Sequence, residues 1–188
     1  MTEYALVRSS RKTVAVQVGE GGRVTVRAPQ RMPRREIDAF VAAQEDWIAR
    51  RREEILERER AMQTVVLTQE RLDAMRRRGE AWLPALAARW APRLGVTPAG
   101  ITITNAAKRW GSCSARGRLC FSVRTLLLPE PCVEYVVVHE LAHLREMNHS
   151  PRFYAVVERA MPDWRARADA VRAFERTHRI VQPGKDGK

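Results

Sequence analysis

The sequence predicts an α+β fold in which a small antiparallel or mixed sheet packs against helices. Short stretches of alternating apolar residues occur near the beginning and near the middle of the chain, and longer stretches with helical periodicity follow each of them. The order is therefore strands, helices, strands, helices, without the regular alternation that is typical of a doubly wound parallel sheet. The chain has 188 residues, 45% of them hydrophobic, which is enough to bury a core.

An N-terminal β-hairpin is the first expected element. Apolar residues alternate over residues 13–18 and again over 23–28, and the glycine-rich segment GEGG between them is a turn signal. Pro33 then begins a helical pattern that continues to about residue 60. A second helical stretch follows Thr68, and Pro84 is expected to kink it or to start a new segment.

Two further strands are expected in the second half of the chain, at 101–105 and, with weaker alternation, at 119–124. The polar segment KRWGSCSARG between them contains glycine and is expected to be a loop. A helix is predicted from Pro131 to about residue 147. Two more helical stretches are expected after it, over about 150–160 and up to about residue 179.

The chain is strongly basic, with 34 Lys and Arg against 22 Asp and Glu, a formal net charge of +12. Such an excess is compatible with nucleic-acid binding. However, the most charged-looking stretch, RRREEILERER, lies within residues 34–60, which are nearly neutral, and it is typical of a solvated helix face. Residues 101–131 carry five basic residues and a single acidic one, directly before the histidine-rich segment. We interpret this local surplus as a means of steering substrate.

Several classes of protein are disfavoured. No apolar run approaches the length of about 18–20 residues that a transmembrane helix needs, so no contact with a membrane is expected. The N-terminal segment lacks the apolar stretch of a signal peptide. The three cysteines, Cys113, Cys120 and Cys132, are odd in number and lack C-x-x-C spacing, which favours reduced thiols in a cytoplasmic protein.

The motif that carries chemistry is HELAH at residues 139–143, an H-E-x-x-H sequence inside a predicted helix. His139 and His143 are four positions apart, so they project from one face of the helix and can bind the same Zn²⁺. Glu140 lies about 100° away around the same turn. It can therefore act as general base on a water that the metal activates, without being a ligand itself.

His149 is the candidate third ligand, because a catalytic zinc site has three protein ligands and one open position. To reach the same metal, His149 must leave the direction of the helix. Asn148 is expected to end the helix through left-handed backbone geometry, and Ser150 and Pro151 are expected to cap and begin the next helix. The alternatives are ordinary histidines on a surface helix, or a structural zinc site that includes the cysteines.

The segments KRWGSCSARG and VRTLLLPEPCVEYVVVHELAHLREMNHSPRFY closely resemble the YgjP-like metallopeptidase family, formerly a domain of unknown function, which is related to zinc proteases of the SprT type. The N-terminal segments SRKTVAVQVGEGGRVTVRAP and IDAFVAAQEDWI also resemble this family. The resemblance implies a zincin-like fold with the H-E-x-x-H helix at the active site. It also implies that His139, His143 and His149 bind zinc and that Glu140 is the catalytic glutamate.

We expect one domain of this family over residues 1–180. Residues 1–66 are expected to form its N-terminal hairpin plus helix, and 67–180 its zincin-like catalytic part. Residues 181–188 are expected to be a disordered tail.

The chain departs from the pattern of the resembled family at two places. Ser122 and Val123 stand where that family usually has Asn-Trp before an arginine, and Tyr154 stands where it usually has Trp. Neither departure touches the expected metal ligands. Both are expected to alter the wall of the substrate groove.

Four residues are candidates for contacts with substrate. Arg109 and Arg124 could stabilise an oxyanion or hold substrate charge. Trp110 could line the cleft, and Tyr154 could donate a hydrogen bond to a tetrahedral intermediate. The alternatives are core packing for the two aromatic residues and ordinary surface exposure for the two arginines. His178 is expected to be exposed and without a role.

The sequence therefore predicts a cytoplasmic zinc-dependent metallohydrolase, with a peptidase acting on peptides or proteins as the first hypothesis. A second hypothesis keeps the metal and makes the substrate a nucleotide phosphoanhydride, although acidic ligands for the Mg²⁺ usual in phosphoryl transfer are few. A third hypothesis is a nucleic-acid-associated protease or binding protein, whose weak nonspecific affinity would depend steeply on salt.

Overall fold

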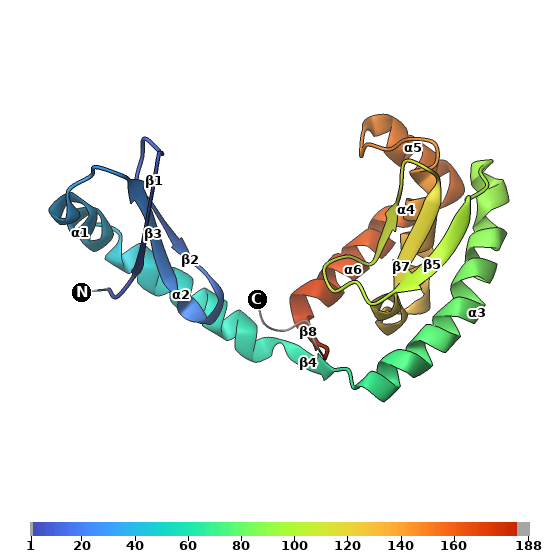
Figure 1. Cartoon of the computed structure of the whole chain (residues 1–188), viewed down its shortest axis with the longest axis horizontal. Helices are drawn as coiled ribbons and strands as arrows, with labels where there is room; N and C mark the ends of the chain where they lie inside the picture. Colours follow the sequence, from blue (N-terminus) through green and yellow to red (C-terminus); the bar gives the residue numbers. More distant parts are fainter. Residues whose placement is uncertain (1, 184–188) are drawn as a thin grey trace. The chain divides into compact units, whose positions relative to one another are not determined.

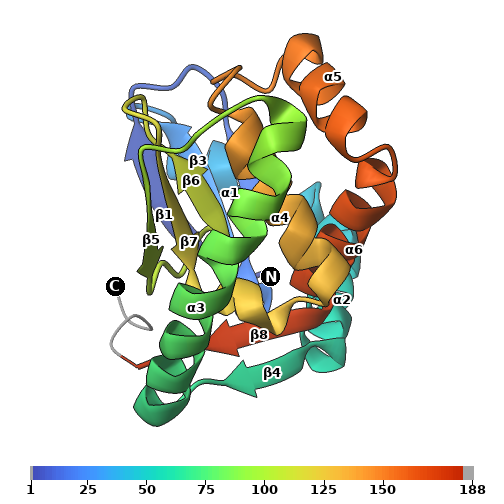
Figure 2. The ribbon, with the colours of Figure 1, turned by 90° about the vertical axis from the view of Figure 1, so that its right-hand side faces the viewer.

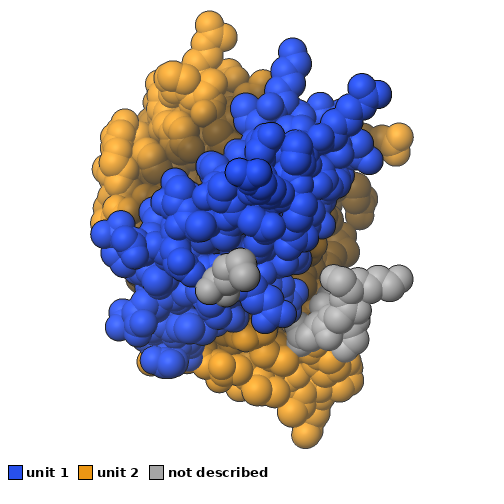
Figure 3. Space-filling view, turned by 90° about the vertical axis from the view of Figure 1, so that its left-hand side faces the viewer, with its two compact units in different colours: residues 1–62 blue, residues 63–188 orange. Residues whose placement is uncertain are grey.

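A computed structural model describes residues 2–183 of the chain. The chain divides into two compact units, residues 1–62 and residues 63–188 (Figure 1, Figure 3). The first unit contains a small sheet and two helices, and the second contains the H-E-x-x-H segment.

The sheet of the first unit has three strands, β1 (Ala5–Ser9), β2 (Ala15–Val18) and β3 (Val24–Pro29), in the order β1-β3-β2. Strands β2 and β3 are antiparallel, with Val16 opposite Val26, which confirms the predicted hairpin. The turn between them contains Gly21 and Gly22, with φ of 65° and 69°, a conformation that favours glycine. Strand β1 pairs with β3 in parallel and was not predicted, because its alternation is short.

Two helices complete this unit, α1 (Arg34–Ala42) and α2 (Glu45–Ala61). The sequence predicted one continuous pattern here, but the chain breaks the helix at Ala43 and Gln44. Alternate residues of β3 point into a core that the two helices cover. This core consists of Val24, Val26, Ala28, Ile37, Val41 and Ile48.

The second unit begins with β4 (Gln63–Val66) and the long helix α3 (Gln69–Leu94). The side chain of Thr68 caps α3 by accepting a hydrogen bond from the backbone N–H of Arg71. Pro84 neither starts a new segment nor ends the helix, because α3 runs through it to Leu94. The neighbouring apolar residues of α3 are buried against the core, and this packing offsets the backbone hydrogen bond that a proline removes.

The three-stranded sheet of this unit is mixed, which is one of the two predicted alternatives. Its strands are β5 (Gly100–Thr104), β6 (Gly111–Cys113) and β7 (Arg118–Ser122), in the order β5-β7-β6. Strands β5 and β7 are parallel, whereas β6 and β7 are antiparallel. Strand β6 lies within the segment that was predicted as a loop, because its three residues show no apolar alternation. The 3₁₀ helix η2 (Val123–Leu127) follows β7 directly.

Helix α4 (Glu130–Ala142) packs against α3, β6, α5 (Pro151–Ala160) and α6 (Trp164–Thr177) (Figure 2). Most of its residues are buried, as expected for a helix with apolar side chains around most of its circumference. These elements confirm an α+β fold in which a small sheet packs against helices. One of these helices, α4, contains the first four residues of the H-E-x-x-H segment.

Strand β4 pairs in parallel with β8 (His178–Val181), which joins residues 63–66 to the second unit. Neither strand was predicted, and the last predicted helix ends at Thr177 instead of about 179. Val181 belongs to β8 and Gln182 is 3% exposed, so these two residues, expected to belong to a disordered tail, are ordered. Residues 184–188 of that tail lie outside the described residues. Among the described helices, none has the length and apolar character needed to cross a membrane.

Candidate metal centre and active site

Three histidine side chains converge at the end of α4. His139 lies in the last turn of this helix, His143 is its C-cap, and His149 follows after a tight turn. One ring nitrogen of each histidine lies within 4.8 Å of the other two, and the Nε2 atoms of His139 and His149 are 2.9 Å apart. This is the only group of three potential metal-ligating side chains that residues 2–183 bring together, and it includes no cysteine.

The chain turns back toward the metal ligands earlier than the sequence predicted. Helix α4 ends at Ala142 and not at about residue 147, and the N–H groups of Arg145 and Glu146 both bond to the carbonyl of Ala142, at 3.0 Å and 3.1 Å. The left-handed geometry expected for Asn148 was wrong, because no described residue other than glycine has a positive φ. A compact turn, not a left-handed cap, therefore brings His149 back.

The start of α5 places a phenylalanine beneath the three histidines. Ser150 caps α5 as predicted, since its hydroxyl accepts a hydrogen bond from the N–H of Phe153 at 3.4 Å. The Phe153 ring is fully buried and contacts the rings of His139, His143 and His149, with centroid distances of 4.8, 4.5 and 4.9 Å. This one side chain thus supports all three imidazoles.

Hydrogen bonds orient two of the histidines. Nδ1 of His143 lies 3.1 Å from the carbonyl oxygen of Glu146; a carbonyl only accepts, so Nδ1 carries the proton and Nε2 keeps its lone pair. Nδ1 of His139 lies 3.4 Å from the hydroxyl of Tyr135, one helical turn earlier. Such partners fix the orientation of a metal-binding imidazole.

The electrostatic environment of these histidines suits a metal. Burial, together with the neighbouring histidines, lowers the pKa of His139 to about 3. Burial also lowers the pKa of His143. Both imidazoles are therefore neutral near pH 7, which is the form that binds a metal ion. Three converging imidazoles fit a divalent metal of the zinc type.

Glu140 lies beside this cluster and is only 6% exposed. Burial raises the pKa of its carboxyl to about 7, and the positive charge of Arg109 opposes this rise. The first residue of β6, Gly111, lies directly against the Glu140 side chain. A buried carboxyl whose pKa lies near neutrality is typical of groups that take up and release protons in catalysis.

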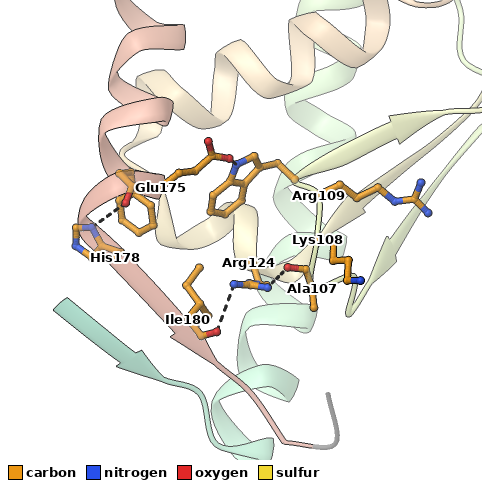
Figure 4. A pocket seen from close by; sticks show the side chains of 9 residues that line it. Ala107, Lys108, Arg109, Arg124, Glu175, His178 and Ile180 are labelled. Atoms are coloured by element: carbon orange, nitrogen blue, oxygen red, sulfur yellow. Dashed lines mark hydrogen bonds between the residues drawn. The ribbon is translucent and has the colours of Figure 1, made fainter. Parts of the chain in front are cut away.

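Three of the four candidate substrate residues line one pocket of about 190 Å³ (Figure 4). Arg109 and Trp110 line it from the loop before β6, and Arg124 lines it from η2. The guanidinium of Arg124 donates to the carbonyl oxygens of Ala107 and, at 3.5 Å, of Ile180. Trp110, which lines this pocket, is half-buried.

The carbonyl of Trp110 accepts hydrogen bonds from the backbone N–H of Ser122 at 2.7 Å and from the hydroxyl of Thr125 at 2.9 Å. Its indole N–H donates to Glu175 at 2.6 Å. Ser122, one of the two departures from the resembled pattern, is buried and donates from its hydroxyl to Ala106 at 2.7 Å. The loop before β6 is therefore held in place at several points.

Tyr154 lies elsewhere, next to the histidines. Its ring is 6.3 Å from that of His149 and stacks on Trp164 at 5.0 Å. His178 also differs from expectation: it is half-buried, its ring stacks on Phe174 at 4.0 Å, and it lines the pocket with Arg124.

Sequence reasoning missed several residues of the site. Phe153 was visible in the sequence three positions after Ser150, but nothing indicated that its ring would contact all three histidines. Gly111 and Tyr135 carried no signal of their own, because their roles come from the contacts of β6 and α4.

One family model and one solved structure are similar to this chain. The model of the YgjP-like metallopeptidase domain matches residues 12–73 and 67–173, so the match spans both compact units. No curated protein matches the chain. One solved structure, the metallopeptidase zymogen abylysin of Pyrococcus abyssi, is 23% identical, with a TM-score of 0.46, over 53% of this chain and 99% of that chain. Because the family model covers most of the sequence, the chain belongs to the YgjP-like metallopeptidase family.

Proposed function

We propose that this protein is a zinc-dependent peptidase whose metal is held by His139, His143 and His149 and whose general base is Glu140. The observation that carries the proposal is the convergence of three imidazoles, with ring nitrogens within 4.8 Å of one another, beside a buried carboxyl group. Three histidines leave one position of a tetrahedral site open, as catalysis requires.

The catalytic steps follow from the residues around this centre. Bound zinc would supply acidification of a water molecule and polarisation of the scissile carbonyl. Glu140 takes the proton of the attacking water and then delivers it to the leaving amine. Burial raises the pKa of Glu140 to about 7, so this carboxyl can both accept and release a proton near neutral pH. Phe153 and Tyr135 hold the imidazoles in position.

The substrate contacts that we assign are Arg109, Trp110 and Arg124 in the pocket beside β6, and Tyr154 on the side of His149. Both arginines can hold negative charge on the substrate. Tyr154 can donate its hydroxyl to the tetrahedral intermediate, although its stacking on Trp164 also supports a packing role.

The test combines metal analysis with activity. Wild-type protein reconstituted with zinc is expected to hold one zinc per chain and to cleave casein. Glu140→Gln is expected to keep the zinc and to lose activity by about 10²–10⁴-fold, the contribution of a general base. His149→Ala is expected to lose zinc, whereas His178→Ala, a histidine outside the cluster, is expected to keep it. Full activity in Glu140→Gln would refute the base, and zinc retained in His149→Ala would refute the ligand set.

The same preparation distinguishes the other functions. Hydrolysis of nucleoside triphosphates without cleavage of casein would favour the phosphoanhydride hypothesis. Binding of DNA at low salt, lost steeply as salt rises, would favour a nucleic-acid-associated role. A cytoplasmic location remains a prediction, and fractionation of cells that express the protein tests it.

A further inference from the structure

We propose that the pocket of Figure 4 is a subsite for a carboxylate of the peptide substrate, which gives the enzyme a preference for acidic peptides. This inference rests on the proposed function, because it deepens the substrate class of the same site. The carboxylate is either an acidic side chain or the C-terminal carboxylate of the peptide. These two sources offer the same chemistry and are separated by the experiment below.

The position of the pocket relative to Glu140 is the first argument. Trp110, which lines the pocket, directly precedes Gly111 in the chain, and the Gly111 backbone lies against the side chain of Glu140. The wall of the pocket therefore begins one residue along the chain from the residue that contacts Glu140. Arg109, which also lines the pocket, is close enough to Glu140 for its positive charge to act on that carboxyl.

The charge of the pocket is the second argument. Lys108, Arg109 and Arg124 line it, and its one acidic lining residue is Glu175. The carboxylate of Glu175 accepts a hydrogen bond from the indole of Trp110 at 2.6 Å, so it is already engaged. Three cations against one engaged acid leave a local positive field, which attracts an anionic group.

The cations at the pocket are free to contact a ligand to different extents. Lys108 and Arg109 are both exposed, and among residues 2–183 neither forms an ion pair. In Figure 4 both residues lie on the side of the pocket opposite His178, and their charged ends point away from Glu175 and His178. Arg124 also holds the backbone, because it donates to the carbonyls of Ala107 and Ile180 and so joins the loop to β8. We therefore assign the contact with substrate mainly to Lys108 and Arg109.

The rigidity of the pocket is the fourth argument. The backbone of Trp110 is fixed by Ser122 and Thr125, and the ring of Phe174 lies edge-on to the Trp110 indole at 6.0 Å. Binding of a ligand to a subsite that is already formed costs little conformational free energy, because few groups must become ordered. Charge-assisted hydrogen bonds from Lys and Arg to a carboxylate are then available without a large rearrangement.

Binding is measured without turnover, on zinc-loaded Glu140→Gln protein, by fluorescence anisotropy. The probes are three dansylated pentapeptides: Ala-Ala-Glu-Ala-Ala amide, Ala-Ala-Gln-Ala-Ala amide, and pentaalanine with a free C-terminus. At low salt the Glu peptide, the free-carboxylate peptide or both are expected to bind about 10-fold more tightly than the Gln amide, and the advantage is expected to shrink as salt rises. Which of the two binds tightly identifies the source of the carboxylate.

The variant Lys108→Gln/Arg109→Gln is expected to remove this advantage and to leave binding of the Gln amide unchanged. The charge-matched control is Arg71→Gln/Arg77→Gln, which changes two exposed arginines of α3 that do not line the pocket, and it is expected to keep the advantage. Equal binding of all three peptides, or a preference that survives in the double variant, would overturn the proposal.

Two further results would show that the pocket binds a different group or that the proposed function is wrong. If a single-stranded oligonucleotide displaces the Glu peptide and loses its own affinity in the double variant, the pocket binds phosphate and the carboxylate assignment is wrong. If the wild-type protein binds no zinc or does not cleave casein, the proposed function is wrong. The binding measurements still test the peptide preference, because they do not require turnover.

Discussion

Gly111 and Glu140 are packed so closely that a side chain at position 111 would have to displace the carboxyl of Glu140. A Cβ atom built on Gly111 would lie 2.6 Å from Cγ and 2.7 Å from Oε1 of Glu140. Strand β6 therefore faces the proposed general base with a residue that has no side chain. Glycine is needed at position 111 because of the limited space and not because of an unusual backbone angle, since the φ angle of Gly111 is not positive.

Gly111→Ala is expected to displace the carboxyl of Glu140 and to leave the histidines in place. Displacement of a catalytic group by about 1 Å can cost about 100-fold in rate, so we expect a fall in kcat of this order with zinc content unchanged. Steady-state kinetics on a cleaved peptide and metal analysis check this. The matched control is Gly100→Ala in β5 of the same sheet, whose Cβ would meet only the movable end of the Arg118 side chain, at 3.3 Å. Equal activity of the two variants would contradict the role of Gly111.

Phe153→Leu is expected to weaken zinc binding by about 10-fold, because the ring that supports all three histidines is lost. The same substitution is expected to cost about 1.5 kcal/mol of unfolding free energy. Phe121→Leu is the control, because Phe121 is also fully buried in the core of this unit but contacts none of the histidine rings among the described residues. Chelator competition and urea unfolding measure the two quantities. A similar loss of zinc affinity in both variants would show that general destabilisation is the cause.

Tyr135→Phe removes the hydroxyl that lies 3.4 Å from Nδ1 of His139. Loss of such a partner weakens metal binding by about 10-fold, and titration against a zinc chelator measures the change. Tyr154→Phe is expected to leave zinc affinity unchanged, since the described residues give the Tyr154 hydroxyl no hydrogen bond to a histidine. If both variants bind zinc like the wild type, the Tyr135 hydroxyl does not orient His139.

The metal-free protein is expected to lose stability as pH rises, through Glu140. Burial raises the pKa of this carboxyl from 4.5 to about 7 in the folded chain. Between these values the folded state binds more protons than the unfolded state, so the free energy of unfolding falls as pH rises. The stabilisation is complete below the unfolded pKa and is lost above the folded one, with a total of about 3 kcal/mol at most.

Glu140→Gln cannot titrate, so it isolates this effect. Urea unfolding in the presence of a chelator is expected to show similar stability of wild type and variant at pH 4, and a variant that is more stable by up to about 3 kcal/mol at pH 8. All other titratable groups are the same in both proteins, so their contributions cancel in the difference. A difference between the two proteins that does not change with pH would contradict the buried, proton-binding state of Glu140.

The elements that could be predicted are those whose pattern is local. Val24 and Val26 alternate along a strand, and the residues of α3 repeat with the period of a helix, so the N-terminal hairpin and the long helices follow from the order of residues alone. Strands β1, β4, β6 and β8 are short and show no clear apolar alternation. They are strands because distant segments pair with them, as β4 does with β8, and such pairing leaves little trace in a short sequence.

The sequence by itself determined the chemical groups of the candidate site: the spacing of His139, Glu140 and His143 on one helix, with His149 shortly after it. Only the tertiary structure decided how these groups are supported and surrounded. The turn after Ala142, the ring of Phe153 beneath the histidines and the bare backbone of Gly111 against Glu140 all join residues by contact. Helical spacing is fixed by backbone geometry and can be read along the chain, whereas close contacts depend on how separate elements pack, which the order of residues does not display.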